Sequence, residues 1–340
     1  MWTLRQAQVV IVIAGCLGMA YTQLTTCPAS IEIVRDLGGT GLHVGILGAL
    51  PTGMLFVQFL AAWLGNKLNY RRPWWFWFSL LQRLLCIPAA VGPWLFPEVP
   101  DVIWLWALLL SWAATQGLVH FCNPLWLSWM GDYLPHKGLS HYWGIRHYWM
   151  QATAALSLVG ASLGLRYLAT DIRQGFAGIV LIGCLLGVID ILMFFKVDEP
   201  KVTRLPDAGL WEVLSGPFRH PGFRSFIGFT CFWHFAAMMG APFISLYLLD
   251  HIGMSADEVL MLWVFSWVGG AISAKWFGRL AEAHGNRVVL IVCTALKSIN
   301  MIALMLVPPV PQLAFWILAP VFMVDMALNS GIAIANNGFM

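Results

Sequence analysis

The sequence predicts an all-α, polytopic membrane protein. Of its 340 residues, 59% are hydrophobic and only 10% are charged, whereas a soluble domain devotes about a quarter of its residues to charge. The 19 Trp and 21 Phe residues add apolar surface that a water-soluble fold of this size could not bury. The net charge of +3 is small and scattered, so no phosphate-binding face is indicated. These observations exclude a soluble enzyme, a disordered chain and a nucleic-acid-binding protein.

Ten segments are long and apolar enough to cross a membrane, which takes about 20 residues in a helix. They are residues 8–27, 41–65, 73–96, 102–129, 147–169, 175–195, 226–249, 258–277, 288–307 and 312–335. Proline within several of them predicts kinks, which are tolerated because neighbouring helices can satisfy the backbone groups that a proline frees. These prolines are Pro51, Pro88, Pro124, Pro242 and Pro320. The seven Cys residues are scattered singly, which indicates neither a disulfide framework nor a zinc site.

The distribution of Lys and Arg predicts the orientation of these spans. Fourteen of the 19 fall on the side that holds the N-terminus, and three, Arg35, Arg166 and Arg173, fall on the other. The last two, Arg83 and Lys297, lie inside spans. Because cytoplasmic loops carry the excess of basic residues, we expect a multi-pass protein of the plasma (inner) membrane with a cytoplasmic N-terminus.

The longest polar stretch, residues 196–225, divides the chain into domains. It contains four prolines and five basic residues, and we interpret it as a cytoplasmic linker with a short surface helix around residues 210–214. It separates an N-terminal six-helix bundle, residues 1–195, from a C-terminal bundle, residues 226–340, in which four helices are visible.

Two turns stand at corresponding places in the two halves. Residues 65–72, GNKLNYRR, follow the second predicted span, and residues 278–287, GRLAEAHGNR, follow the eighth. Their first glycines are 213 residues apart, about the length of one six-helix unit with its linker. Repeated helical halves are typical of secondary transporters.

The second turn is similar to the loop signature G-x-L-A-D-x-x-G-x-R of the major facilitator superfamily, with Glu282 at the acidic position. This resemblance implies two pseudo-repeated six-helix bundles. It also implies a cytoplasmic gating loop formed by Gly278, Glu282, Gly285 and Arg287. There, two helices approach closely at the first glycine, and the acid and the arginine join a charge network that latches one state. The first turn is a poorer copy, because Asn69 stands where the acid belongs.

A third segment also resembles the family. Residues 129–135, WMGDYLP, with the basic and glycine residues that follow, are similar to the loop after the fourth span in many bacterial members. Family members usually have twelve spans, and this sequence stops at Met340, after the tenth. The sequence is therefore either a fragment or a shortened member that lacks the last helix pair of its second bundle, and we favour the fragment.

Two cations lie within predicted spans, where an ionisable side chain must face protein or water. Arg83 and Lys297 are 214 residues apart, nearly the repeat spacing, and so occupy equivalent places in the two halves. One interpretation is a charge-relay pair that lines the pathway. The other is a structural clamp, in which each cation pairs with a neighbour or reaches toward the membrane surface.

Asp325 and Asn329 lie one turn apart on one face of the last predicted span. A carboxyl group buried in a region of low dielectric can bind and release protons near neutral pH. The alternative is a salt bridge, with Lys297 as the partner. The resemblance implies that this span lines the central pathway.

Four more polar residues are candidates for the substrate pathway. Tyr21 and His234 occupy the first helices of the two halves at the repeat spacing, and imidazole titrates near physiological pH. Gln116 and His120 form a polar stripe on the fourth span together with Asn123. The alternative for each is a hydrogen-bonded packing residue between helices.

These residues and the resemblance predict a secondary active transporter that moves a small solute by alternating access. Proton coupling is expected, because Asp325 and the two histidines can titrate and no carboxylate cluster suggests a metal-cation site. The expected partners are a small-molecule substrate, protons and the lipid bilayer, with no nucleic acid, cofactor or enzymatic activity. Arg83 and Lys297 favour an anionic metabolite, although a sugar, drug or peptide also fits. The alternative is a non-transporting membrane receptor or scaffold of the same fold, which would bind a ligand without flux.

Overall fold

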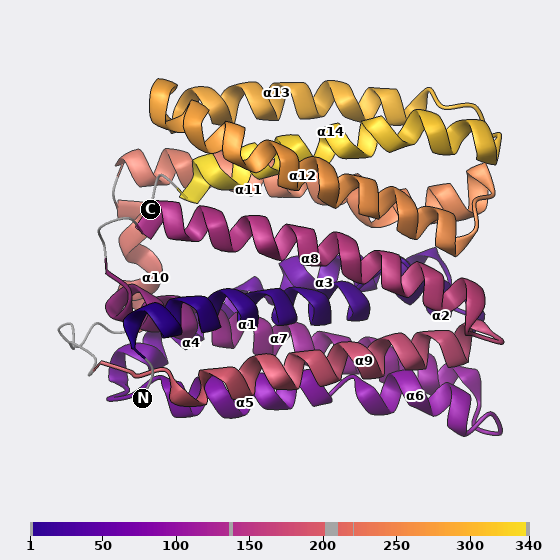
Figure 1. Cartoon of the computed structure of the whole chain (residues 1–340), viewed down its shortest axis with the longest axis horizontal. Coiled ribbons are helices and arrows are strands. Elements are labelled where there is room, and N and C mark those ends of the chain that lie inside the picture. Colours follow the sequence, from indigo (N-terminus) through magenta and orange to yellow (C-terminus); the bar gives the residue numbers. More distant parts are fainter. Residues whose placement is uncertain (1–2, 136–138, 201–209, 220, 338–340) are drawn as a thin grey trace. The chain divides into compact units, whose positions relative to one another are not determined.

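The computed structural model describes residues 3–135, 139–200, 210–219 and 221–337, and most of them lie in helices (Figure 1). The first half contains α1 (Leu4–Thr25), α2 (Ala29–Asp36), α3 (Gly41–Gly53), η1 (Met54–Phe56), α4 (Val57–Lys67), α5 (Arg72–Leu84), α6 (Ile87–Leu95), α7 (Asp101–Tyr133), α8 (Leu139–Tyr167), α9 (Ile172–Met193) and η2 (Phe194–Lys196). The second half contains α10 (Leu210–Arg219), α11 (Pro221–Tyr247), η3 (Leu248–Ile252), α12 (Ala256–His284), α13 (Asn286–Met305) and α14 (Pro311–Asn337).

Proline breaks two of the predicted spans, as expected. The second span consists of α3, the 3₁₀ turn η1 and α4, and Pro51 lies in the last turn of α3. The third consists of α5 and α6, and Pro88 lies in the first turn of α6. Backbone N–H groups in the first turn have no acceptor within the helix, so proline costs no hydrogen bond there. Pro124 and Pro320, by contrast, lie inside the continuous helices α7 and α14.

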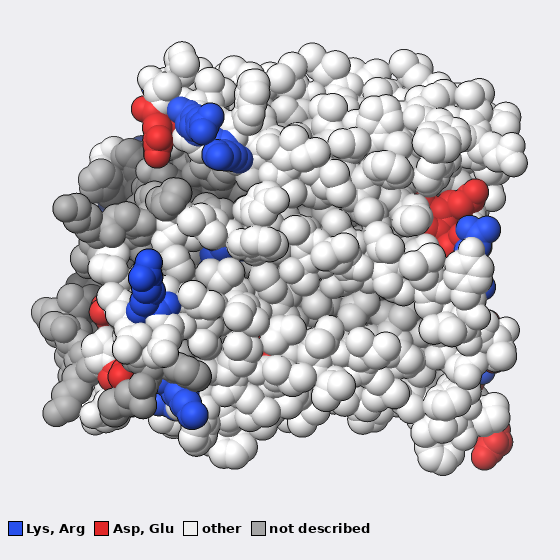
Figure 2. Space-filling view, in the orientation of Figure 1, with Lys and Arg blue, Asp and Glu red and all other residues white. Residues whose placement is uncertain are grey.

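Within the described residues, eight helices are long and apolar enough to cross a membrane. They coincide with eight of the ten predicted spans. The other two predicted segments lie on α8 and α11, which are 29 and 27 residues long but are not among those eight, so the ten-span count stays a prediction. On the face drawn in Figure 2, charged side chains gather toward the helix ends.

The helices form two compact units whose segments alternate along the chain. Unit 1 contains residues 1–7, 33–137 and 191–244, and unit 2 contains residues 8–32, 138–190 and 245–340. In unit 1, α7 contacts α3, α4, α5 and α6, and in unit 2, α12 contacts α8, α13 and α14. The sequence-based division into residues 1–195, 196–225 and 226–340 stays a prediction.

Each unit has a tightly packed region. In unit 1, the rings of Trp75, Trp129 and Phe194 meet at centroid distances of 4.9 to 5.8 Å, and all three side chains are buried. In unit 2, α12 and α14 approach so closely at Gly269 that a Cβ there would lie 2.2 Å from the carbonyl oxygen of Met323. Only glycine allows this approach.

The linker contains the expected surface helix, α10, which extends beyond residues 210–214 to Arg219. Its Trp211 and Phe218 side chains are exposed. Residues 201–209, which include two of the linker's basic residues, lie outside the described residues.

Candidate functional site

An ion pair joins two neighbouring helices within unit 2. Lys297 of α13 donates from Nζ to both carboxylate oxygens of Asp325 on α14, at 2.7 and 2.8 Å. Asn329, one turn along α14, donates from Nδ2 to Asp325 Oδ2 at 3.2 Å. The Lys297 and Asp325 side chains are 12% and 21% exposed. The structure therefore places three of the predicted site residues together and supports the salt-bridge alternative for Asp325.

A second polar contact holds the same two helices. Asn300, one turn after Lys297 on α13, donates from Nδ2 to the backbone carbonyl of Val321 on α14 at 3.0 Å. Because neighbouring α-helices in lipid gain little from apolar burial, hydrogen bonds and close packing hold them together. The ion pair is thus part of a polar seam between α13 and α14.

A buried hydrogen-bonded chain connects α14 to α8 on an adjacent face. Gln151 of α8 donates from Nε2 to the hydroxyl of Ser330 on α14 at 3.2 Å, and the same amide nitrogen lies 2.8 Å from Nε2 of His147. Gln151 and Ser330 are 1% and 3% exposed. At Gly270 of α12, an added Cβ would lie 3.0 Å from Gln151 Oε1. Three helices of unit 2 therefore meet around one buried amide.

The sequence alone favours other candidates over Gln151 and does not identify Ser330. The available signal is that Ser330 follows Asn329 directly and that Gln151 is a polar residue inside an apolar helix. Neither observation shows that the two residues meet, because they are 179 residues apart.

In unit 1, His120 is hydrogen-bonded through both ring nitrogens. Its Nε2 lies 2.6 Å from the carbonyl oxygen of Pro51, and its Nδ1 lies 3.0 Å from Nε2 of Gln58. A neutral imidazole that donates from Nε2 and accepts at Nδ1 satisfies both contacts. His120 therefore ties α7 to the broken second span on both sides of η1, which agrees with the packing alternative for this residue.

The remaining pathway candidates are divided between the two units. Gln116 lies one turn before His120 on α7, and His234 is exposed on α11, both in unit 1. Tyr21 is buried on α1 in unit 2, the unit that holds Asp325 and Asn329. That these residues face one common pathway stays a prediction.

The second cation of the proposed relay, Arg83, lies in the last turn of α5. Lys297 forms its ion pair in the other unit. The equivalence of these two cations in the repeat stays a prediction.

The predicted gating loop connects α12 to α13. Gly285 has φ +83° and separates the two helices, and this left-handed region strongly favours glycine. Glu282 and Arg287 are exposed. The close approach expected at Gly278 is not observed among the described residues, because no heavy atom lies within 4 Å of a Cβ built there. Gly278 is half-buried, and the latching role of the loop stays a prediction.

The corresponding turn of unit 1 forms a charge network that the sequence did not reveal. Arg71 is 7% exposed and donates from Nη1 to Asp132 at 2.7 Å. Glu199 accepts from the backbone N–H groups of Arg71 and Arg72, the latter at 3.1 Å. The acids therefore come from the end of α7 and from the segment after η2, rather than from the position of Asn69 within the turn.

These features define a multi-pass helical membrane protein with polar contacts inside its helix bundles. The family model of the Major Facilitator Superfamily matches residues 10–340, and the chain belongs to this family of membrane transporters. No curated protein sequence matches the chain significantly.

Solved structures share the fold at low sequence identity. A mutant of the nucleoside transporter NupG has a TM-score of 0.72 at 13% identity, over 98% of this chain and 82% of that one. A partially occluded, inward-open form of the xylose transporter XylE from E. coli has a TM-score of 0.64 at 12% identity, over 98% and 86% of the two chains. A D-xylose–proton symporter has a TM-score of 0.64 at 14% identity, over 97% and 85%.

Proposed function

We propose that this protein is a secondary active transporter that moves a small solute across the plasma membrane by alternating access, coupled to protons. In this proposal the chain crosses the membrane with ten spans, including α8 and α11, and its N-terminus is cytoplasmic. Family membership supports the transport class. One structural neighbour is a D-xylose–proton symporter, which is compatible with proton coupling here.

The observation that carries the proposal is the Lys297–Asp325 pair with Asn329. An ion pair within the spans has two ways to open: a proton neutralises the carboxylate, or an anionic group of the solute replaces the carboxylate at Lys297. Both ways leave a charge or hydrogen-bonding group free, which is costly in a medium of low dielectric. Occupation of the site by a proton or a solute would therefore be linked to a rearrangement of α13 and α14.

The chemistry of this pair favours a solute with a carboxylate or another anionic group. Lys297 supplies the cation, and Asn329 supplies an amide that can bond a second oxygen of the solute once Asp325 is protonated. In the proposed mechanism Gln116, His120, His234 and Tyr21 line the rest of the pathway, and His120 also fixes the shape of the broken second span.

The test is solute uptake into proteoliposomes that contain the purified protein, with a panel of anionic and neutral solutes and an imposed pH gradient. We expect Asp325→Asn to abolish accumulation driven by the pH gradient while exchange of solute across the membrane continues. The matched control is Asp257→Asn, since Asp257 lies in the same unit and makes a longer ion pair, 3.7 Å, with the exposed Arg166. Full pH-driven uptake by Asp325→Asn would exclude the proposed role of this carboxylate, and solute binding without any flux would favour the receptor alternative.

A further inference from the structure

Two tryptophans on one face of α12 have indole N–H groups that are buried without an acceptor. Trp263 and Trp267 lie one turn apart, and Gly270 follows on the same face. Both side chains are half-buried, and within the described residues neither Nε1 atom has a hydrogen-bond partner. A buried Trp usually finds a partner for its N–H, and a buried donor that lacks one costs free energy. This face of α12 therefore carries two donors that a polar ligand would satisfy.

Beside Gly270, the same face meets a buried acceptor that also lacks a partner. Gln151 is 1% exposed, and its Nε2 is engaged by Ser330 and His147. Its Oε1 has no hydrogen-bond partner in the described part of the chain and would lie 3.0 Å from a Cβ at Gly270. Together with the two indoles, this oxygen gives two donors and one acceptor over about two turns of α12. Such a set suits hydroxyl groups, because a hydroxyl both accepts and donates.

These groups connect to the ion pair along α14. The ring of Trp263 meets the ring of Phe322 edge-on, with a centroid distance of 6.1 Å. Phe322, Asp325 and Asn329 share one face of α14, because they are three and four residues apart in turn. Asp325 is one turn, about 5 Å, beyond Phe322 along the helix, and all of these residues belong to unit 2 with Lys297. A small solute is therefore long enough to reach from Lys297 to the indoles.

We propose that the solute is a hydroxylated organic anion, such as a sugar acid or another polyhydroxy carboxylate. Its carboxylate lies at Lys297, and its hydroxyl groups accept from the indoles of Trp263 and Trp267 and donate to Oε1 of Gln151. The inference rests on the proposed function, which places an anionic group at Lys297, and it adds residues of α8 and α12 that determine specificity. An aliphatic acid of equal length leaves the three buried groups unsatisfied and so binds less well.

The test is isothermal titration calorimetry of the purified protein in detergent with three matched probes. Gluconate is a polyhydroxy carboxylate, hexanoate has the same carbon chain without the hydroxyl groups, and glucitol has the hydroxyl groups without the carboxylate. We expect the wild type to bind gluconate at least about tenfold more tightly than hexanoate or glucitol. This comparison needs no variant, so it decides the question even where a substitution prevents folding.

Two substitutions test the donors. Trp263→Phe and Trp267→Phe keep an aromatic ring and lose the indole N–H. Each should weaken gluconate binding about fivefold, in keeping with the loss of one hydrogen bond, and should leave hexanoate binding unchanged. A merely structural role would weaken the binding of both probes equally. The matched control is Trp276→Phe, on the same helix with its side chain 77% exposed, which should change neither affinity.

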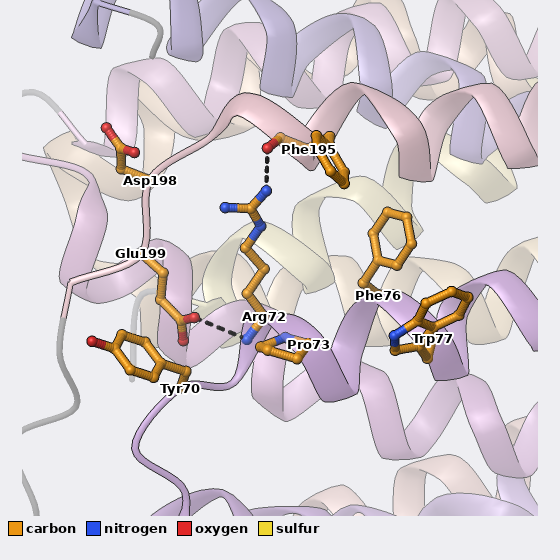
Figure 3. Close-up of a pocket in the computed structure, with 8 residues that line it drawn as sticks. All are labelled: Tyr70, Arg72, Pro73, Phe76, Trp77, Phe195, Asp198 and Glu199. Carbon is orange, nitrogen blue, oxygen red and sulfur yellow. Dashed lines mark hydrogen bonds between the residues drawn. The ribbon is translucent and has the colours of Figure 1, made fainter.

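A cation in the other unit needs a control of its own. Arg72 lines a pocket of unit 1 together with Asp198 and Glu199 (Figure 3), and its guanidinium donates to the backbone carbonyl of Phe195. Arg72→Gln should leave gluconate binding unchanged. Loss of gluconate binding in this variant would place the anion outside unit 2 and would overturn the inference.

The remaining outcomes separate this inference from the proposed function. Hexanoate or glucitol binding as tightly as gluconate, or unchanged gluconate binding by both tryptophan variants, would overturn the inference. Lys297→Met should abolish the binding of both carboxylates. If gluconate and hexanoate bind equally and both depend on Lys297, the proposed function stands and the inference fails. Carboxylate binding that does not depend on Lys297 would contradict the proposed function itself.

Discussion

The ion pair between α13 and α14 makes a quantitative prediction for stability. Asp325→Asn leaves the Lys297 ammonium, only 12% exposed, without its anion. Breaking a fully buried pair in this way costs about 3–5 kcal/mol. Because the Asp325 side chain is 21% exposed, solvent screens part of the charge, and we expect a loss of about 2–3 kcal/mol from the free energy of unfolding.

The double variant separates the loss of the pair from the penalty for an isolated charge. Lys297→Met together with Asp325→Asn removes both charges, so it should be less destabilised than the sum of the two single variants, with a coupling energy of about 1–2 kcal/mol. The assay is reversible denaturant unfolding of the four proteins in one detergent, followed by far-UV circular dichroism. Ser298→Ala, an exposed substitution next to Lys297 on α13, is the control and should change stability by less than about 0.5 kcal/mol. Additive effects of the two single substitutions would refute the reasoning, because they would show that Lys297 and Asp325 do not interact energetically.

Four other substitutions test the packing within each of the two units through thermal unfolding. Gly269→Ala places a methyl group against the backbone of α14 and should cost about 1–3 kcal/mol, whereas Gly278→Ala, with no heavy atom within 4 Å of the new Cβ, should be neutral or slightly stabilising. His120→Leu removes the hydrogen bonds to the Pro51 carbonyl and to the Gln58 side-chain amide, and should lower the free energy of unfolding by about 1–3 kcal/mol. An unchanged thermal unfolding midpoint would mean that α7 does not hold the broken second span. Arg71→Gln replaces the charged donor to the Asp132 carboxylate at the end of α7, and should lower the free energy of unfolding by about 1.5–3 kcal/mol. Equal stability of this variant and wild type would show that solvent screens the Arg71–Asp132 ion pair.

Much of the fold follows from local sequence properties. The apolar segments predict where the helices lie. Proline predicts two of the breaks, at Pro51 and Pro88, whereas α7 and α14 continue through Pro124 and Pro320. Both signals are local, because they depend on the hydropathy of about 20 consecutive residues and on the missing N–H of one residue. Family membership follows from a short signature, with Glu282 at its acidic position.

The polar contacts could be predicted only in part. The sequence identifies Lys297 and Asp325 as intramembrane charges but leaves proton carriage and ion pairing open, since the choice depends on how two helices face each other. The acids that bind at Arg71 could not be predicted from the turn itself. Asp132 and Glu199 are far away in the sequence, and only the packing of α7 and of the segment after η2 brings them to it.

The interrupted second span has a mechanical consequence. A continuous α-helix resists bending along its whole length, because hydrogen bonds join each turn to the next. The second span instead consists of two short helices, α3 and α4, joined by the 3₁₀ turn η1. His120 of α7 is hydrogen-bonded to the Pro51 carbonyl of α3 and to the Gln58 side-chain amide of α4. These two contacts let α7 set the angle between α3 and α4. Loss of the two His120 contacts would therefore free this joint, so that the Lys67 end of the span could move while the Gly41 end keeps its position.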